Sequence, residues 1–275
     1  KVVVLGTPAE EAGHGKVHLI DGGAFDDADV AMMLHPAPGN VAAFQTTALA
    51  RLRVEYRGKE SHTGMSPWEG INALDAAVGA YVNLSMLRQQ MKPSWKLGAI
   101  IIDGDSRANV TPSLYYMEVV LRAPNAQELT ELRSKVEACL NSAAVATGCE
   151  VNVTIKDPIV QDILANSALA QVYQENAEKL GMYFPDASRF AAMMGGSTDA
   201  GNVSHVLPLI HPFFGLDTRS INHTAEFASA AGAQSSYERA LTAAKALSLT
   251  ALEIMRDTEL LQRVKEEFDI KYVKE

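Results

Sequence analysis

The sequence predicts an α/β protein in which a smaller β-α-β-β-α-β unit is inserted into a larger α/β domain. Strand and helix patterns follow one another in that order between residues 48 and 157, which is the split ferredoxin-like arrangement. The flanking segments, 1–47 and 158–275, combine short apolar runs with helical periodicity. We therefore expect them to pack together as one domain, with 48–157 as its lid. Hydrophobic residues make up 47% of the 275 residues, an ordinary share for a globular chain with a core.

The first segment opens on the apolar run Lys1–Leu5, which predicts a buried strand. A glycine-containing loop, Gly6–Gly13, follows it, and a second strand is expected at Val30–Leu34, ending at His35-Pro36. Lys1 is not an initiator methionine, and a chain seldom starts inside its own core. We therefore expect these residues to be the C-terminal part of a longer protein.

The central unit should contain four strands and two helices. The strands are expected at Leu49–Tyr56, Lys96–Ile102, Leu114–Leu121 and Cys149–Ile155, and the helices at Gly70–Gln90 and from Asn125 to about Ala146. Asn125 should cap the second helix and Gly148 should end it. The spacing of this helix predicts one buried face, formed by Leu129, Leu132, Val136 and Leu140.

The last segment should be mainly helical. Helices are expected at about Leu164–Leu180, Ala231–Arg256 and Glu259–Phe268, with a loop of small residues at Gly195–Asp199 and an apolar stretch at Val206–Phe214 that leads to Asn222-His223-Thr224.

Composition excludes several classes of protein. Lys+Arg 24 against Asp+Glu 33 gives 24 − 33 = −9, so a general nucleic-acid surface is not expected. No apolar run approaches the ~20 residues of a membrane span, so we expect no membrane partner. The two cysteines, Cys139 and Cys149, cannot form a disulfide framework and are expected to be unreactive core thiols.

Two adjacent carboxylates, Glu10 and Glu11, stand in a loop directly after the first predicted strand, where ligands bind in α/β sheets. His35 ends the second predicted strand, and His223 follows another apolar stretch. Carboxylate and imidazole groups together form zinc sites. The alternative is a solvated turn for the glutamates and a structural role for each histidine.

Other motifs fail on inspection. Gly15-Lys16 lacks the remaining positions of a phosphate-binding loop, and Ser197 lacks the Gly-x-Ser-x-Gly frame of a serine hydrolase. Glycosylation sequons begin at Asn109 and Asn222, the second beside a candidate ligand. A compartment without N-glycosylation is therefore favoured, and we expect a cytoplasmic protein.

Seven stretches occur in the order that one known family shows: Gly6–Glu11, Gly22–Phe25, His35-Pro36, Gly58–His62, Pro67–Asp75, Gly196–Asp199 and Asn222–Thr224. Through them the chain resembles the dinuclear-zinc exopeptidase and amidohydrolase family of aminoacylase, carboxypeptidase G and acetylornithine deacetylase. The resemblance spans nearly the whole chain. It implies a zinc-exopeptidase-like catalytic α/β domain in 1–47 and 158–275, with a ferredoxin-like dimerisation or lid domain in 48–157.

The resemblance also implies a role for each candidate residue. Glu10 resembles the general base, and Glu11 the metal ligand beside it. His35 resembles a ligand of the second metal, and His223 the C-terminal ligand of the first. His62 matches a lid histidine that stabilises the oxyanion in the opposite subunit's site, although the simpler alternative is that it only caps a turn. The residues implied to face the substrate are Asn109, Arg122, Gly196, Ser197 and Thr198.

By this resemblance the protein is a homodimeric hydrolase with two divalent ions, zinc or alternatively cobalt or manganese. It would cleave the amide bond of dipeptides that end in Lys, Orn or Arg, or of N-acyl amino acids. One alternative is hydrolysis of aminobenzoyl-glutamate, and another is a metal-free dimer that only binds small amides. Two departures stand out: His14 occupies a position that is commonly Gly, and residues 1–275 contain no upstream His-x-Asp region or bridging ligand. We therefore expect this chain alone not to complete the two-metal site.

Overall fold

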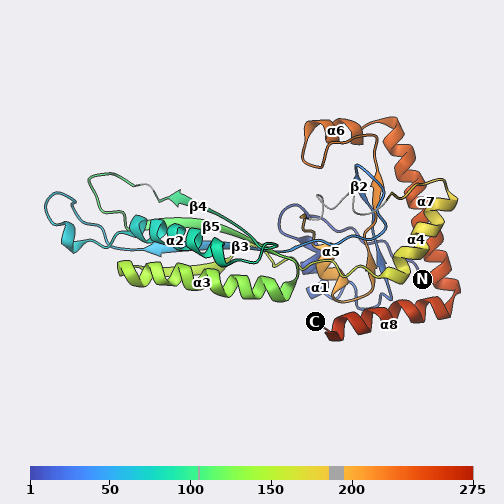
Figure 1. Cartoon of the computed structure of the whole chain (residues 1–275), viewed down its shortest axis with the longest axis horizontal. Coiled ribbons are helices and arrows are strands. Elements are labelled where there is room, and N and C mark those ends of the chain that lie inside the picture. Colours follow the sequence, from blue (N-terminus) through green and yellow to red (C-terminus); the bar gives the residue numbers. More distant parts are fainter. Residues whose placement is uncertain (105, 186–194, 275) are drawn as a thin grey trace. The chain divides into compact units, whose positions relative to one another are not determined.

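The computed structural model describes residues 1–104, 106–185 and 195–274 (Figure 1). The chain divides into two compact units. Unit 1 comprises Lys1–Thr46 and Asp162–Glu275, and unit 2 comprises Thr47–Gln161. Each unit has its own hydrophobic core.

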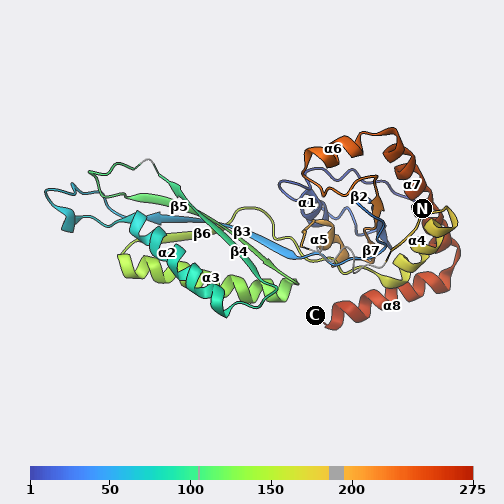
Figure 2. The ribbon, with the colours of Figure 1, turned by 45° about the horizontal axis from the view of Figure 1, so that its top comes forward.

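Unit 2 is a four-stranded antiparallel sheet with two helices on one face (Figure 2). Its main elements are β3 (Ala48–Arg57), α2 (Ala73–Leu87), β4 (Lys96–Asp103), β5 (Leu114–Ala123), α3 (Ala126–Thr147) and β6 (Glu150–Ile155), with short 3-10 turns at Pro67–Glu69 and Arg88–Gln90. The strand order across the sheet is β4-β5-β3-β6. The predicted β-α-β-β-α-β order is confirmed, and β4 and β6 form the two edges.

The core of unit 2 follows from strict alternation along β5. Tyr115, Met117, Val119 and Leu121 are buried and face the helices, whereas the residues between them are half-buried on the opposite face of the sheet. Tyr56 on β3 fixes α3 to the sheet, because its hydroxyl donates a hydrogen bond of 2.9 Å to the Leu140 carbonyl. We call the face away from the helices the open face.

The predicted ends of α3 are confirmed. The Asn125 side chain accepts a 2.8 Å hydrogen bond from the Glu128 amide, which satisfies one of the free donors at the helix start. Gly148 ends the helix with φ of 76°, a left-handed conformation that glycine adopts without a steric penalty. All four residues of the predicted apolar face are fully buried.

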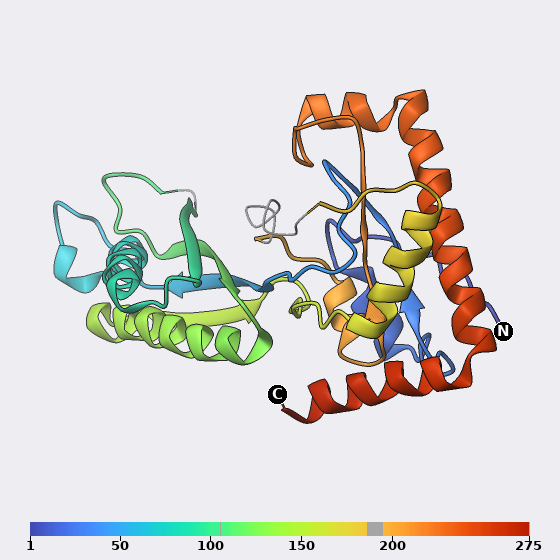
Figure 3. The same ribbon diagram turned by 45° about the vertical axis from the view of Figure 1, so that its right-hand side comes forward.

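Unit 1 has shorter strands and more helices. Its elements are α1 (Gly15–Asp21), β1 (Ala31–Met32), β2 (His35–Ala37), α4 (Ser167–Lys179), α5 (Ala200–Ser204), β7 (Leu209–Ile210), β8 (Phe213–Gly215), α6 (Ala225–Ala231), α7 (Gln234–Arg256) and α8 (Thr258–Lys274). Parallel pairs join β1 to β7 and β2 to β8. Helix α4 packs beside α7, and α8 crosses their ends (Figure 3), with Tyr173, Ile254 and Val264 in the shared core.

Three predictions for unit 1 are wrong. Lys1–Leu5 is not a strand: none of the described residues pairs with its backbone, and Val4 is 91% exposed. A strand needs a neighbour for its amide and carbonyl groups, so an apolar run alone does not make one. The strand expected at Val30–Leu34 is reduced to β1, and His35 begins β2 instead of ending a strand. Helix α6 was not predicted.

Among the helices of the described residues, none combines the length and the apolar character that a membrane span requires.

Candidate active site

The turn that carries Glu10 and Glu11 is held in one conformation from both sides. Ala9 and His14 adopt left-handed backbone angles, with φ of 63° and 52°. For residues other than glycine this conformation costs about 1–2 kcal/mol each and is concentrated at functional sites. The buried His14 ring places its Nδ1 atom 3.3 Å from the Glu10 carbonyl oxygen, to which it donates. The unusual His14 therefore acts as a clamp on the turn.

The fold brings Glu11 to His223. Glu11 Oε1 lies 3.6 Å from His223 Nε2, and the two side chains are 73% and 74% exposed. His223 also has a left-handed backbone, with φ of 65°, and it directly precedes Thr224, the cap of α6. Because the Thr224 hydroxyl accepts a hydrogen bond from the Phe227 amide, the loop that presents His223 has a fixed end.

His35 lies close to the same loop, and a hydrogen bond defines the tautomer of its neutral ring. Its Nδ1 atom is 2.7 Å from the Pro36 carbonyl oxygen, which can only accept, so Nδ1 carries the proton. The Nε2 atom then presents its lone pair, and it lies 3.5 Å from the side-chain nitrogen of Asn222, the residue before His223. A backbone acceptor on one ring nitrogen is the arrangement that orients a metal-ligating histidine through the other.

These donors fit a metal ion. Zinc binds nitrogen and oxygen at about 2.0–2.2 Å in a tetrahedron, which places two ligand atoms roughly 3.4 Å apart. The 3.6 Å between Glu11 and His223 agrees with that spacing. Within the described ranges no three His, Cys, Asp or Glu side chains gather closely enough to hold an ion. Glu11 and His223 thus form a pair of donors, with His35 near their loop.

His211, which the sequence analysis missed, lies beside His35. Its ring centroid is 5.6 Å from that of His35, it is 4% exposed, and both of its ring nitrogens lack a hydrogen-bond partner among the described residues. Burial, with smaller contributions from His35 and Lys16, lowers the pKa of His211 to about 3, so the ring is neutral. No sequence pattern distinguishes this histidine from an ordinary residue of an apolar stretch.

The substrate-facing loop predicted at Gly196, Ser197 and Thr198 directly precedes α5. Thr198 is buried, whereas Gly196 is exposed. The next residue, Asp199, is fully buried and binds Lys16 at the start of α1. The loop is therefore fixed to the segment that follows the Glu10–Glu11 turn.

In unit 2, His62 and Asn109 lie on adjacent segments. The Thr63 amide donates to the Asn109 carbonyl at 3.3 Å, and His62 pairs with Val110 in an isolated antiparallel bridge. The Gly64 amide donates to Nδ1 of His62 at 3.1 Å, so the proton of the neutral ring is on Nε2. His62 therefore caps a turn, as in the simpler alternative. The same hydrogen bond leaves the Nε2–H group of His62 as an exposed donor.

Arg122 lies at the other end of β5 on the open face. It is directly opposite Lys96 on β4 and diagonal to Arg51 on β3. Burial and the charge of Arg51 lower the pKa of Arg122. Like charges directly opposite each other destabilise a sheet.

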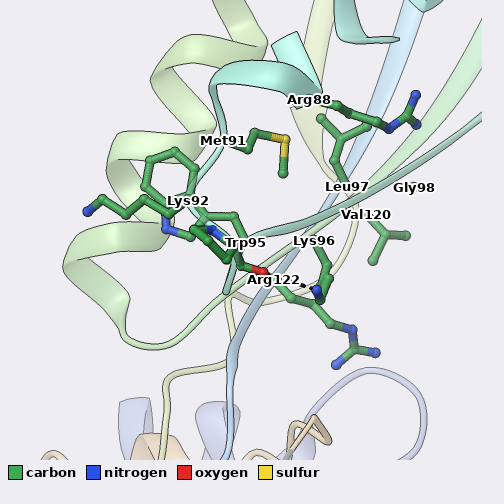
Figure 4. A pocket seen from close by; sticks show the side chains of 10 residues that line it. Arg88, Met91, Lys92, Trp95, Lys96, Leu97, Gly98, Val120 and Arg122 are labelled. Atoms are coloured by element: carbon green, nitrogen blue, oxygen red, sulfur yellow. Dashed lines mark hydrogen bonds between the residues drawn. The ribbon is translucent and has the colours of Figure 1, made fainter.

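A cavity of about 530 Å³ opens beside this pair (Figure 4). Its lining includes the cations Arg88, Lys92, Lys96 and Arg122, together with Trp95. Lys92 is paired with Glu128 and Glu131. In a chain of net charge −9, this concentration of cations suits a carboxylate or another anion.

The two lid groups are far apart. The segment with His62 leaves β3 at Arg57, which pairs with Leu114 at the start of β5. Arg122 lies eight residues further along that strand, which at ~3.4 Å per residue is about 27 Å away. A single dipeptide cannot reach both groups of one lid.

Comparison with known proteins finds a matching family model and several relatives. The profile of the family "Peptidase dimerisation domain" matches residues 45–148. The chain is 46% identical to Xaa-Arg dipeptidase of Mus musculus and 45% identical to that of Homo sapiens. Both alignments extend over 275 residues, which is 100% of this chain. It spans 64% and 63% of those relatives, which is less than two thirds of their length. It is also 25% identical to a component of the p-aminobenzoyl-glutamate hydrolase of Escherichia coli, over 95% of this chain and 66% of that protein.

Solved structures confirm the fold class. The aminobenzoyl-glutamate utilization protein from Klebsiella pneumoniae superposes with a TM-score of 0.67 at 20% identity, over 90% of this chain and 60% of that one. A putative aminohydrolase from Staphylococcus aureus also gives 0.67, at 16% identity, over 88% and 64% of the two chains.

Proposed function

We propose that the full-length protein is a metal-dependent dipeptidase of the peptidase family whose dimerisation domain matches residues 45–148. Unit 1 would carry the catalytic machinery and unit 2 would be the lid and dimerisation domain. The observation that carries the proposal is the pairing of Glu11 with His223 at 3.6 Å, beside a turn that also presents Glu10. The substrates would be dipeptides with Lys, Orn or Arg at the C-terminus, in keeping with the relatives named Xaa-Arg dipeptidase.

Glu11, His223 and His35 would be ligands of two divalent ions, zinc in the first instance. Other residues of the full-length protein would complete the coordination of both ions. When bound, such ions supply a nucleophile at neutral pH and polarise the amide carbonyl. The protonated Nδ1 of His35 keeps its Nε2 available as a ligand.

Glu10 would be the general base. It neighbours a ligand without being one, so its carboxylate is available to take a proton from the attacking water and to pass that proton to the leaving amine. The clamp between His14 and the Glu10 carbonyl fixes the backbone on which this carboxylate stands. A proton acceptor must be held within hydrogen-bond reach to be effective, so the strained turn serves the chemistry.

His62 would stabilise the oxyanion. The hydrogen bond from Gly64 leaves the Nε2–H group of His62 as a neutral donor in an exposed position. A single donor of this kind contributes about 2.7–4 kcal/mol to transition-state stabilisation. Asn109, on the adjacent segment, would contact the same substrate.

Arg122 and Lys96 would bind the substrate carboxylate. Because they lie about 27 Å from the His62 end of the lid, one active site would take His62 and Asn109 from one subunit and Arg122 from the other. A two-fold dimer provides this arrangement twice, once for each site.

The dimer would form along α2 and the edge strand β4. Val78, Tyr81, Val82 and Met86 recur at helical spacing on α2 and are 41–61% exposed. Ile100, on the open face of the edge strand β4, is 57% exposed. An unpaired edge beside an apolar stripe favours association with a second copy of the same face.

A cytoplasmic location would follow from Asn222. Its side-chain nitrogen lies 3.5 Å from His35, so a glycan attached there would displace a candidate metal ligand. The sequon is compatible with this site only where N-glycosylation does not occur.

One observation favours a second candidate function. The cavity beside Arg122 is lined by Arg88, Lys96 and Arg122 in addition to the paired Lys92, which suits a substrate with two carboxylates, as an N-acyl-glutamate or aminobenzoyl-glutamate carries. The experiment is to assay the full-length protein, loaded with zinc, cobalt or manganese, against dipeptides that end in Lys, Arg, Glu or Leu and against aminobenzoyl-glutamate. Preference for Lys and Arg supports the dipeptidase, and preference for glutamate supports the second candidate. No turnover and no bound metal would support a dimer that only binds small amides.

A further inference from the structure

A buried ion pair in unit 1 has no role in the sequence analysis or in the proposed chemistry. Lys16 Nζ is 2.7 Å from Asp199 Oδ1, and the two side chains are only 4% and 0% exposed. The backbone amide of Lys16 also donates to the other carboxylate oxygen, Oδ2, at 3.0 Å. Asp199 thus holds Lys16 by its side chain and by its main chain at once.

Each partner stands at the end of a loop that carries candidate site residues. Lys16 follows the clamped Glu10–His14 turn and is the second residue of α1. Asp199 follows Gly196–Thr198 and immediately precedes α5. The pair therefore joins two loops that are distant in the sequence.

Stability alone does not account for such a pair. Removing two charges from water costs several kcal/mol per ion, and apolar side chains of similar volume often give equal or greater stability. What a buried pair with two contacts does provide is a fixed distance and orientation between the segments that bear it.

We propose that Lys16 and Asp199 are positioning residues that hold the Glu10–Glu11 turn in register with the Gly196–Thr198 loop. The expected effect on catalysis rests on the proposed function. The link between the two loops rests only on the hydrogen bonds between Lys16 and Asp199. A shift of about 1 Å at a catalytic group can reduce turnover about 100-fold, so losing the pair would act on kcat.

The test is the double variant Lys16→Met/Asp199→Asn in the full-length protein. It removes both charges and keeps the size of both side chains. The side-chain oxygen of the new asparagine can still accept a hydrogen bond from the backbone amide of residue 16. We expect a folded protein with unchanged metal content, KM within about two-fold of wild type, and kcat lower by about 100-fold. The matched control is Lys265→Met/Asp29→Asn, which removes an exposed ion pair of the same unit and should leave both constants unchanged. A folded double variant with wild-type kcat would overturn the proposal.

A second variant covers the case in which the double variant does not fold. Lys16→Arg keeps the buried pair charged but moves the cationic group, so we expect a folded protein with kcat about ten-fold lower and KM unchanged. Wild-type kcat in folded Lys16→Arg would show that the pair only neutralises charge.

Hydrogen exchange separates this proposal from the proposed function. If the wild type hydrolyses no amide, the proposed function fails, but the structural link can still be tested. Amides in residues 9–20 and 195–206 should then exchange about ten-fold faster in whichever of the two variants folds, and both segments should change together. Faster exchange in one segment alone would contradict a link between the two loops.

Discussion

Oε1 of Glu11 and Nε2 of His223 lie 3.6 Å apart, although 223 − 11 = 212 positions separate the two residues in the sequence. A carboxylate and an imidazole at this distance can bind one metal ion without moving. Glu10, the adjacent residue, shares the strained backbone of the turn but not this pairing. The pairing of Glu11 with His223 is in keeping with the different roles that the resemblance implies for the two glutamates.

Two histidines are held in opposite tautomers by backbone groups. The Pro36 carbonyl accepts from Nδ1 of His35, whereas the Gly64 amide donates to Nδ1 of His62. His35 therefore offers a lone pair at Nε2, and His62 offers a proton there. These are the states that a metal ligand and an oxyanion donor require.

The first prediction concerns recognition of the substrate carboxylate. Lys96→Met and Arg122→Met should each raise KM about 10–100-fold with little change in kcat, because a charge-assisted hydrogen bond contributes about 1.5–3 kcal/mol to binding. Steady-state kinetics of the full-length protein will measure both constants. Lys135→Met, which removes an exposed cation of α3, is the control. Unchanged KM in both variants would exclude this cavity as the carboxylate site.

The second prediction concerns assembly. Val82→Asp places a charge in the exposed apolar stripe of α2 and should convert the dimer to a monomer, as measured by sedimentation velocity. Val145→Asp is the control, because Val145 is 83% exposed but lies on α3. A dimer that survives Val82→Asp and is lost in Val145→Asp would place the interface on the other helix.

The third prediction concerns the pH dependence of stability. Burial lowers the pKa of His211 to about 3, below the ordinary 6.5 of the unfolded chain. Below pH 6.5 the His211 ring therefore binds a proton in the unfolded state but not in the folded state. The free energy of unfolding consequently falls as the pH drops below 6.5. Between pH 7 and 5.5 this effect amounts to about 1 kcal/mol.

His211→Leu should remove that part of the pH dependence. The free energy of unfolding, measured by urea denaturation at both pH values with a chelator present, should change by about 1 kcal/mol less than in wild type. His18→Leu, at an exposed histidine of α1, should behave as wild type. An unaltered pH dependence in His211→Leu would mean that the buried ring titrates normally.

The sequence was most informative where local rules and burial agree. In unit 2, alternation along residues 49–56 predicts the strand β3, and the capping residues predict α3 with its two ends; these elements are confirmed. The apolar run Lys1–Leu5 shows the opposite case, because whether a strand forms depends on a neighbour that periodicity cannot supply.

The sequence identified residues of the candidate site, but it did not predict which of them contact one another. Motifs indicate Glu11, His35 and His223, but no pattern relates Lys16 to Asp199 or identifies His211 as buried. These are long-range pairings, and the same residue types occur on solvated surfaces. The clamp formed by His14 was equally hidden, since it depends on a left-handed backbone.

The fourth prediction concerns the exchange of residues between subunits. Full-length His62→Ala and Glu10→Ala should each be inactive, yet refolding them together should restore roughly a quarter of wild-type activity. Half of the dimers are then mixed, and each mixed dimer has one complete site of two. Proven subunit exchange without recovery would mean that His62 does not act across the dimer.

The most direct test compares the two adjacent glutamates in the full-length protein, by metal content and turnover measured on the same samples. Glu10→Gln removes the base but no ligand, so it should keep its metal and lose at least about 100-fold in kcat. Glu11→Gln removes a ligand, so its metal content should fall and its activity should return in part with excess zinc. Equal loss of metal in both variants, or full turnover in Glu10→Gln, would contradict the assignment of a base beside a metal ligand.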